Sequence, residues 1–409
     1  MNMVSDRSRV LVTVTGKDTP GITAALTSII ATNDAELLDI EQVVVQGRLT
    51  LCLLLSLDKQ RHRGDPVLKD LLFTAKDMGL ELDFQVLPDE DTSVFPRRHQ
   101  FAVTIFGDRV GAEDLGRVAE VLARHQANID RILRLAGDPL SSVEFVVSLA
   151  GGQRKDRELR GDLLVATSGR PVDIAVQREN LSRRSKRLVV MDMDSTLIQM
   201  EIIDEMARLH GVATEVSSIT HRAMNGELNF EESLQARVGL LAGLAYSDCQ
   251  KLALDLPLSE GAERLLRVLK TLGYRTGVIS GGFTFAADAL KRRLGLDYAY
   301  ANQLEIENGK LTGKVRGPIV GPQRKSDLLD VIAQLVGFSL EQTIAIGDGA
   351  NDLAMLERAG LGIAFHAKPK LREAADTSVS AGGLDRILYL LGLSQQEVSE
   401  LLGETAEAA

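Results

Sequence analysis

Apolar runs alternate with amphipathic stretches along the whole chain, and near the N-terminus the same order of elements occurs twice. Residues 9–18 and 100–108 each read as a strand that breaks at a glycine and is followed by an amphipathic helix. Both copies continue with a pair of apolar runs (40–57 and 129–149), a helical segment and a last strand (80–87 and 172–177). The pattern predicts two consecutive α+β modules of ferredoxin-like βαββαβ order.

The segment after these modules alternates strands with helices, which predicts an α/β domain with a doubly wound parallel sheet. Its clearest strands lie at 188–191, 276–279, 343–346 and 361–364. The pair Asn308-Gly309 predicts a tight antiparallel hairpin near the edge of the sheet. A strongly helical insertion, at about 202–256, separates the first two strands and is placed like a cap over their carboxyl ends.

These patterns predict domain boundaries in a chain of 409 residues. The expected parts are two modules at 1–92 and 93–181, the second with its linker, an α/β domain at 182–396 and an acidic tail at 397–409. The basic cluster at 183–187 contains no aromatic platform for nucleic acid, so we interpret it as part of a solvated linker. The last residues, 395–409, read as a helix end that frays into a disordered tail.

Composition narrows the class of protein. Aromatic residues make up only 4% and Trp is absent, so the cores must be mainly aliphatic. The net charge of −10 argues against a general nucleic-acid surface. No apolar stretch reaches the ~18 residues of a membrane span and the N-terminus lacks a signal-peptide core, so we expect a cytoplasmic protein without membrane contacts. The two cysteines provide no disulfide framework.

The most informative positions are two carboxylates at the end of the first α/β strand. Asp192 and Asp194 follow an apolar run at spacing i, i+2, so in a strand both would face one site at the carboxyl end of the sheet. Two such carboxylates repel each other unless a divalent cation lies between them or one carries a proton. Both conditions suit phosphoryl transfer, whereas a lone Asp-x-Asp also fits an ordinary polar turn.

Three further segments carry matching chemistry. A second apolar strand ends at Ser280 and Gly281, where a hydroxyl and glycine backbone can approach an anion closely. Lys325 precedes a helix-like stretch and supplies a positive charge. A third strand ends in the glycine-opened acidic turn that contains Asp348 and Asn351. This ordered set resembles the haloacid dehalogenase superfamily of aspartyl-phosphate enzymes.

Within that superfamily the segment is similar to the phosphoserine phosphatase family. The matching motifs are 192–197, 226–230, 280–283 and 347–352. Asn229 followed by Glu232 predicts a helix start that sets Phe230 and Arg237 on one helical face, about 10 Å apart. The resemblance implies that Glu201 holds the ammonium group of O-phosphoserine, that Arg237 holds its carboxylate and that Phe230 closes over it.

The resemblance also implies a mechanism. Asp192 is expected to be the nucleophile, and Asp194 to protonate the leaving serine oxygen and then to activate water. Mg²⁺ is the expected cofactor, held by the carboxylates of Asp192 and Asp348 and the backbone carbonyl of Asp194. Ser280, Gly281 and Lys325 are expected to bind the phosphoryl oxygens, with support from Asn351 and Asp352.

The two N-terminal modules resemble ACT domains, which commonly bind amino acids to regulate an attached enzyme. In the first copy we expect Thr19 to be the helix N-cap and Pro20 to open the helix, whose N-terminus would attract a carboxylate. Gly16, Asp18 and Gly21 complete the expected regulatory loop, with L-serine as its ligand and a homodimer as the regulated assembly.

The second copy departs from the loop pattern. Val110 stands where the first copy has proline, and acidic residues follow Gly111, so we expect this copy to have a structural role. For the first copy, dimerisation without ligand binding remains an alternative.

Three alternative functions remain open. The chain could transfer its phosphoryl group to another alcohol, or hydrolyse another small phosphorylated metabolite. It could also be an amino-acid sensor with a vestigial catalytic half, although the complete set of Asp192, Asp194, Lys325 and Asp348 argues against that.

Overall fold

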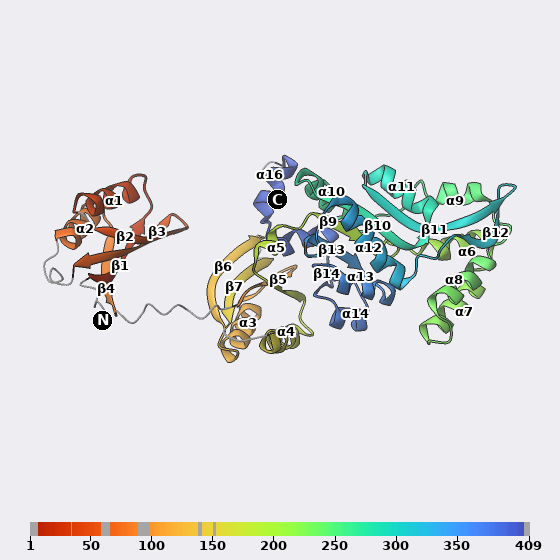
Figure 1. The fold of residues 1–409 in the computed structure, drawn as a ribbon, viewed down its shortest axis with the longest axis horizontal. Coiled ribbons are helices and arrows are strands. Elements are labelled where there is room, and N and C mark those ends of the chain that lie inside the picture. The colour runs from red at the N-terminus through yellow and green to blue at the C-terminus, as the bar shows by residue number, and fades with distance from the viewer. Residues whose placement is uncertain are drawn as a thin grey trace. The chain divides into compact units, whose positions relative to one another are not determined.

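The computed structural model describes most of the chain as two compact units, residues 1–97 and 98–409 (Figure 1). The described residues are 7–33, 35–58, 66–88, 99–137, 141–149 and 153–404, except for the side chains of 153–156, 369–370 and 373. Residues 405–409, which hold the end of the predicted acidic tail, lie outside the described residues.

The first unit is one βαββαβ module. Its elements are β1 (Arg7–Lys17), α1 (Ile22–Thr32), β2 (Glu36–Val45), β3 (Arg48–Asp58), α2 (Pro66–Asp77) and β4 (Glu81–Leu87). The strands form an antiparallel sheet in the order β2-β3-β1-β4. Alternate residues of β1, such as Val10, Val12 and Val14, are buried against both helices, as period-2 patterning predicts.

The start of α1 corrects one prediction. The helix begins at Ile22, with Gly21 as its N-cap in a left-handed conformation at φ +98°. Thr19 and Pro20 therefore lie in the preceding turn, and the prediction that Thr19 caps a helix opened by Pro20 is wrong. Glycine adopts this conformation without the Cβ penalty that other residues would incur, so the backbone at Gly21 decides where the helix begins.

The second module has the same order of elements. They are β5 (His99–Gly107), α3 (Ala112–Arg124), β6 (Asn128–Ala136), β7 (Ser142–Leu149), α4 (Gln153–Thr167) and β8 (Val172–Arg178). At the start of α3, the backbone N–H of Gly111 donates to the Asp114 carboxylate, which also accepts from Arg170. The acidic loop is thus occupied by ion pairs of the module itself.

The remaining segment is an α/β domain with a helical insertion. Its principal elements are α5 (Leu181–Arg184), β9 (Leu188–Met191), α6 (Ile202–His210), α7 (Ala213–Met224), α8 (Phe230–Gly239), α9 (Tyr246–Leu252), α10 (Ala262–Thr271), β10 (Arg275–Phe283), α11 (Thr284–Leu294), β11 (Tyr298–Glu307), β12 (Lys310–Arg316), α12 (Pro322–Val336), η3 (Leu340–Gln342), β13 (Thr343–Gly347), η4 (Ala350–Asp352), α13 (Leu353–Arg358), β14 (Gly362–Phe365), α14 (Pro369–Ala374), β15 (Thr377–Val379), η5 (Leu384–Arg386), α15 (Ile387–Leu390) and α16 (Gln395–Leu402). The predicted fold class, with its doubly wound sheet, helical cap and two βαββαβ modules, is confirmed.

The sheet of the α/β domain continues into the second module. Its eleven strands run in the order β12-β11-β10-β9-β13-β14-β15-β8-β5-β7-β6. Strands β9, β10, β11, β13, β14 and β15 are parallel, and β15 joins β8 in an antiparallel pair at Thr377 and Ala175. The second module and the α/β domain therefore share one sheet, an arrangement that no local pattern in the sequence predicts.

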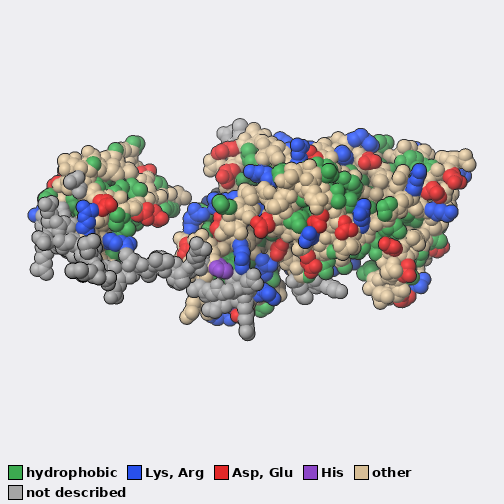
Figure 2. Space-filling model, viewed as in Figure 1, with side chains coloured by type: hydrophobic (Ala, Val, Ile, Leu, Met, Phe, Trp, Pro, Cys, Tyr) green, Lys and Arg blue, Asp and Glu red, His purple; other side chains and the backbone are tan. Residues whose placement is uncertain are grey.

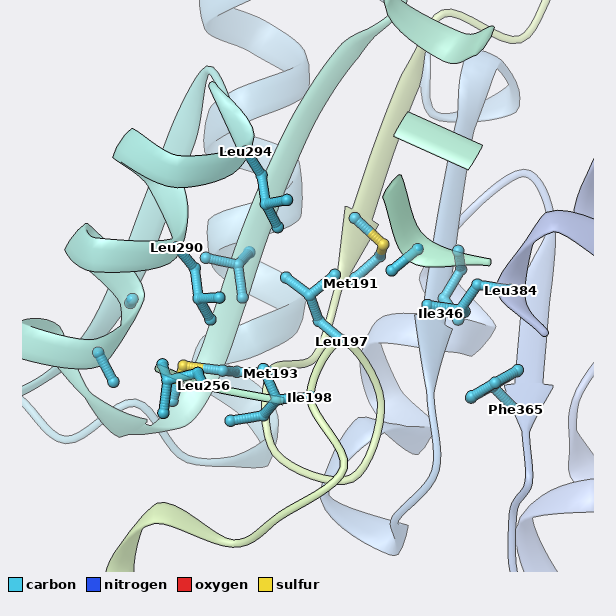
Figure 3. Packing of buried hydrophobic residues seen from close by; sticks show 14 of the residues in the cluster. Met191, Met193, Leu197, Ile198, Leu256, Leu290, Leu294, Ile346, Phe365 and Leu384 are labelled. Atoms are coloured by element: carbon cyan, nitrogen blue, oxygen red, sulfur yellow. The ribbon is translucent and has the colours of Figure 1, made fainter. Parts of the chain in front are cut away.

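Helices cover both faces of the parallel part. Met191 and Ile346 point into a core that includes Leu290 and Leu294 of α11 (Figure 3). Val190 and Ala345, on the opposite face, pack against α12 and α13. The predicted Asn308-Gly309 hairpin is confirmed, because both residues have positive φ and join β11 to β12 as in a type I′ turn.

The predicted solvated linker is wrong for two of its basic residues. Asn180 caps α5 by accepting from the backbone N–H of Arg183, which turns the cluster into a short helix. Arg183 and Lys186 are 5% and 3% exposed, so they lie inside the protein. The second module and the α/β domain enclose them because the two parts share a sheet.

The described surface is mixed in charge. On the face shown in Figure 2, acidic and basic side chains are interspersed rather than gathered by sign. None of the described helices is long and apolar enough to cross a membrane.

Candidate active site

The site lies where the central strands end. All four residues of β9 are buried, and the chain leaves the sheet directly after them at Asp192, which is 5% exposed. Asp192 accepts a hydrogen bond from the backbone N–H of Met193 at 2.7 Å. The following loop turns at Ser195, whose φ of +56° lies in the left-handed region. Asp192 and Asp194 both line one pocket.

That pocket, of about 180 Å³, collects most of the predicted site residues. Its walls include Asp192, Asp194, Glu201, Phe230, Arg237, Gly281, Asp348 and Asn351. Ser280 and Lys325 are fully buried beneath it, where Ser280 Oγ accepts from the backbone N–H of Gly282 at 2.8 Å. The regulatory candidates Gly16, Asp18 and Gly21 belong to the other compact unit.

A buried ion triad anchors the floor. Lys325 Nζ lies 2.7 Å from Asp192 Oδ2 and 2.6 Å from Asp352 Oδ1. Burial alone would lower the pKa of Lys325, but the two carboxylates outweigh it and raise the pKa, so the ammonium stays charged. Burial, and then repulsion from Asp192, raises the pKa of Asp352. Lys325 therefore presents a fixed positive charge beside the expected nucleophile.

Asp194 has the surroundings of a proton donor. Burial raises its pKa well above the ordinary value, and the nearby carboxylates of Glu201 and Asp192 raise it further. Asp194 Oδ1 accepts the backbone N–H of Ile202, at the start of α6, at 3.2 Å. A carboxyl group with a raised pKa holds its proton more readily and can give it to a departing alkoxide.

The acidic groups of the floor suit a hard cation. Carboxylate oxygens of Asp192, Asp348 and Asp352 lie within 4.8 Å of one another. Asp348 Oδ1 accepts from Thr196 Oγ1 at 2.8 Å, while burial and then repulsion from Asp192 raise the pKa of Asp348 to about 6. Such repulsion between oxygen ligands is relieved by a divalent cation, and the donor set fits Mg²⁺. The side chain of Asp194 is not part of this cluster; its expected metal ligand is the backbone carbonyl.

The cap supplies the pocket's other wall. Asn229 and Glu232 form the predicted capping box at the start of α8, with reciprocal 2.9 Å bonds. Phe230 and Arg237 project from this helix into the pocket, and Figure 1 shows α6, α7 and α8 beside the β11–β12 hairpin. Burial lowers the pKa of Arg237, although Glu201 acts in the opposite direction.

Glu201 lies opposite, as the N-cap residue of α6, and accepts from Ser195 Oγ at 2.8 Å. The residue is exposed to solvent, yet enough protein surrounds its carboxyl group for desolvation to raise its pKa. The pocket thus presents the carboxylate of Glu201 and the guanidinium of Arg237. Beneath them lie the acidic side chains and the buried ammonium of Lys325.

Sequence reasoning missed Asn302, which ties three parts of the site together. The residue is 1% exposed, donates from Nδ2 to the Gly281 carbonyl at 2.8 Å and accepts the Val320 N–H at 2.8 Å. Gly281 and Gly321 both lie against Phe230, because an added Cβ would come within 2.8 and 3.3 Å of its ring. Asn302 therefore links Gly281 to Val320, the residue before Gly321, and so supports the two glycines that contact Phe230.

Asn302→Leu is expected to lower kcat/KM by about 10- to 100-fold, because it leaves a buried carbonyl and a buried N–H without partners and loosens the seat of Phe230. The matched control is Gln303→Leu on the same strand, whose side chain is exposed and whose kinetics should be unchanged. Steady-state kinetics together with thermal unfolding check this. Kinetics of Asn302→Leu within twofold of wild type would show that Asn302 does not position the site.

Comparison with known proteins decides the family. The chain is 46% identical over 402 residues to a phosphoserine phosphatase of Streptomyces coelicolor, covering 97% of this chain and 95% of that protein. The chain belongs to the phosphoserine phosphatase family. A phosphoserine phosphatase of Mycobacterium tuberculosis is 42% identical, with 95% of this chain and 94% of that one covered. This member of the family is therefore an enzyme, a phosphoric monoester hydrolase.

Domain models and solved structures agree with this family. The haloacid dehalogenase-like hydrolase model matches residues 186–360, and two ACT domain models match 8–85 and 99–177. A probable phosphoserine phosphatase from Vibrio cholerae superposes with a TM-score of 0.56 at 34% identity, over 78% of this chain and 94% of that one. A haloacid dehalogenase family hydrolase from Salmonella enterica reaches a TM-score of 0.61 at 29% identity, over 71% and 98%.

Proposed function

We propose that the chain hydrolyses O-phospho-L-serine to L-serine and phosphate, the last step of serine biosynthesis, in the cytoplasm. The observation that supports it most is that Glu201 and Arg237 line the same pocket as Asp192, which is paired with Lys325. Phosphoserine carries an ammonium, a carboxylate and a phosphate group, and the pocket offers a group of opposite charge for each. The test is phosphate release from O-phospho-L-serine by the full chain, which should be fast with Mg²⁺ and stop when the metal is chelated.

In this proposal Asp192 attacks phosphorus and forms an aspartyl phosphate while the bond to the serine oxygen breaks. Asp194 gives its proton to that oxygen, for which its raised pKa is suited. Serine leaves, and Asp194, now a carboxylate, takes a proton from the water that attacks the phosphoenzyme. Phosphate departs, and Asp192 and Asp194 return to their starting states.

Lys325 and the Ser280–Gly281 turn complete the proposed phosphate site. Lys325 neutralises charge that would otherwise repel the attacking carboxylate. The carboxylates of Asp192 and Asp348, with the Asp194 carbonyl, would hold Mg²⁺. When bound, the metal supplies further positive charge at the phosphoryl oxygens. Asn351 Nδ2 lies 3.3 Å from Asp192 Oδ2 and keeps this carboxylate in place.

The apparent affinity for Mg²⁺ should fall with acid pH. The pKa of Asp348 is about 6, so the group is a carboxylate above that pH and takes up a proton below it. A proton then competes with the metal, and the Mg²⁺ concentration for half-maximal activity should rise by up to about tenfold per pH unit below pH 6. Magnesium titrations at pH 5, 6 and 7 measure this. A half-maximal concentration that stays constant across the series would contradict the assignment of Asp348.

For regulation, we propose that L-serine binds the first module at the loop of Gly16, Asp18 and Gly21 and inhibits a homodimer. Gly16 has a packing role as well, because an added Cβ would meet Leu80 at 2.5 Å. Gly21 is free of that constraint, since no atom lies within 4 Å of its added Cβ. Every residue of the edge strand β2 is exposed, including Val43 and Val45, which offers an apolar face to a second copy.

Gly21→Val should remove regulation and leave catalysis intact. A β-branched residue is strained at φ +98°, so the start of α1 must rearrange. Serine should then act only as a competitive product, whereas the wild type should also show a noncompetitive component. Gly169→Val, at a positive φ in the second module and with no atom within 4 Å of its added Cβ, is the control for strain alone. The same inhibition pattern in wild type and Gly21→Val would rule out this loop as the serine site.

A further inference from the structure

Lys186 is a buried cation without an ion-pair partner among the described residues. Its side chain is 3% exposed, and its one hydrogen bond goes from Nζ to the Glu341 backbone carbonyl at 2.5 Å. No carboxylate of the described chain lies within 4.0 Å of its Nζ. Lysine is almost never fully buried unless it is paired, because the interior solvates an ammonium poorly. A bound anion would therefore stabilise the ammonium of Lys186 at this position.

A cavity of about 270 Å³ lies beside Lys186, between the second module and the α/β domain. Charged residues from six elements or their ends line it: Arg160, Arg178, Arg183, Lys186, Glu341 and Asp376. Four are basic and two are acidic, although Arg183 also pairs with Glu144 and Glu179 outside the lining, which leaves Lys186 as the cation without an ion pair among these described residues. A ligand of a few heavy atoms would fill this space, which is smaller than the usual drug-sized pocket.

A second buried donor lies in the same wall. Arg183 is 5% exposed, and its guanidinium pairs with Glu144 and Glu179 through the terminal nitrogens. Its Nε is buried and has no hydrogen-bond partner in the part of the chain that the structure describes. Leaving a buried donor unpaired is unfavourable, and both Arg183 Nε and the charge of Lys186 lack a complement among the described residues at this cavity.

The other charged groups are already engaged. Arg160 pairs with Asp376 at 3.2 Å and donates to the Val176 carbonyl. The second carboxylate oxygen of Asp376 accepts from the Gly362 N–H, and Glu341 accepts from Ser182 Oγ. The acidic groups thus have partners nearer than Lys186, which leaves its charge unbalanced.

The geometry points to a binding site for a small oxoanion, carboxylate or phosphate, held by Lys186 and Arg183 at the seam between the second module and the α/β domain. Water could satisfy the free donors, but it would not balance the buried charge. An anion does both. The site lies in the unit that carries the catalytic pocket, shares no lining residue with it, and does not depend on the proposed function.

Acid–base behaviour gives the site a signature. Burial lowers the pKa of Lys186 to about 8, against the opposing pull of Asp376 and Glu341. Arg160, Arg178 and Arg183 also face it, and remain charged throughout the accessible pH range. The ammonium is present below pH 8 and lost above it, so an anion should bind at pH 7 and about tenfold more weakly at pH 9.

The test is calorimetric titration of the full chain with inorganic phosphate, and separately with acetate and L-serine, in wild type, Lys186→Met and Lys186→Arg. Binding at the catalytic pocket is common to all three proteins, so the difference between them isolates the cavity. Wild type at pH 7 should bind one more equivalent of at least one probe than Lys186→Met. Whichever probe supplies that equivalent identifies the anion as phosphate or carboxylate.

Two further comparisons keep the result decisive. Lys186→Arg should keep the extra equivalent at pH 9, where wild type weakens. In anion-free buffer Lys186→Met should unfold at a temperature no lower than wild type, because it removes an unbalanced buried charge. Equal stoichiometry in wild type and Lys186→Met for all three probes would overturn the site. If Lys186→Met does not fold, the site would be overturned by a wild-type affinity for the probes that is the same at pH 7 and pH 9.

Discussion

Asp192→Asn will abolish turnover, by a factor on the order of 10⁴ or more, and will leave no phosphoenzyme to trap. The amide keeps the shape of the side chain and its contact with the Met193 N–H, but it cannot attack phosphorus. Acid quenching of a reaction with labelled phosphoserine, followed by hydroxylamine treatment, should reveal an acyl phosphate in wild type alone.

A surface substitution of the same kind provides the control. Asp330→Asn removes one partner of the exposed Arg358 pair and should leave both rate and phosphoenzyme unchanged. Trapping a normal amount of labelled phosphoenzyme in Asp192→Asn would mean that another group is the nucleophile. Unfolding measurements on both variants separate loss of chemistry from loss of fold.

Arg237→Ala should cost recognition of phosphoserine roughly 2–4 kcal/mol in kcat/KM, since the guanidinium is the cationic group on the cap side of the pocket. O-phosphoethanolamine, which lacks the carboxylate, should lose little activity with the same variant. Steady-state kinetics with both substrates give the selectivity directly. The expected result is therefore a change in the ratio of the two kcat/KM values.

Arg222 lies on α7 of the same cap and forms an exposed ion pair with Glu227. Arg222→Ala should leave kcat/KM unchanged for both substrates. If Arg237→Ala slows phosphoserine and phosphoethanolamine equally, Arg237 serves the fold or the chemistry. The proposed substrate would then lose the contact on which its assignment depends.

Much of the site could be predicted because parallel strands deliver their carboxyl ends to one edge of the sheet. Short apolar runs locate β9, β10 and β13. The residues just after these parallel strands lie close together, and this does not depend on the rest of the fold. That is why Asp192, Gly281 and Asp348 line one pocket although they are far apart in sequence. The capping box at Asn229 was equally accessible, since it depends only on neighbours three residues apart.

Other features depend on contacts that leave no local pattern. Lys186 belongs to a polar stretch that reads as solvated, but it is buried where β15 pairs with β8 and the two parts share one sheet. The inward position of Asn302 follows from strand alternation, but its bonds to Gly281 and Val320 involve segments distant in sequence. At the start of α1, Thr19 and Pro20 favour a helix that begins at Pro20. The helix instead begins after Gly21, which adopts the left-handed conformation of the N-cap.

We propose that this pocket recognises all three charged groups of O-phospho-L-serine. The most direct test is kcat/KM for O-phospho-L-serine, with saturating Mg²⁺, against O-phosphoethanolamine, phospholactate and glucose 6-phosphate. We expect kcat/KM for phosphoserine to exceed that for each competitor by about 100-fold or more, because each competitor leaves Glu201, Arg237 or both without a partner. A sugar phosphate, or either truncated analogue, turned over as efficiently as phosphoserine would contradict it.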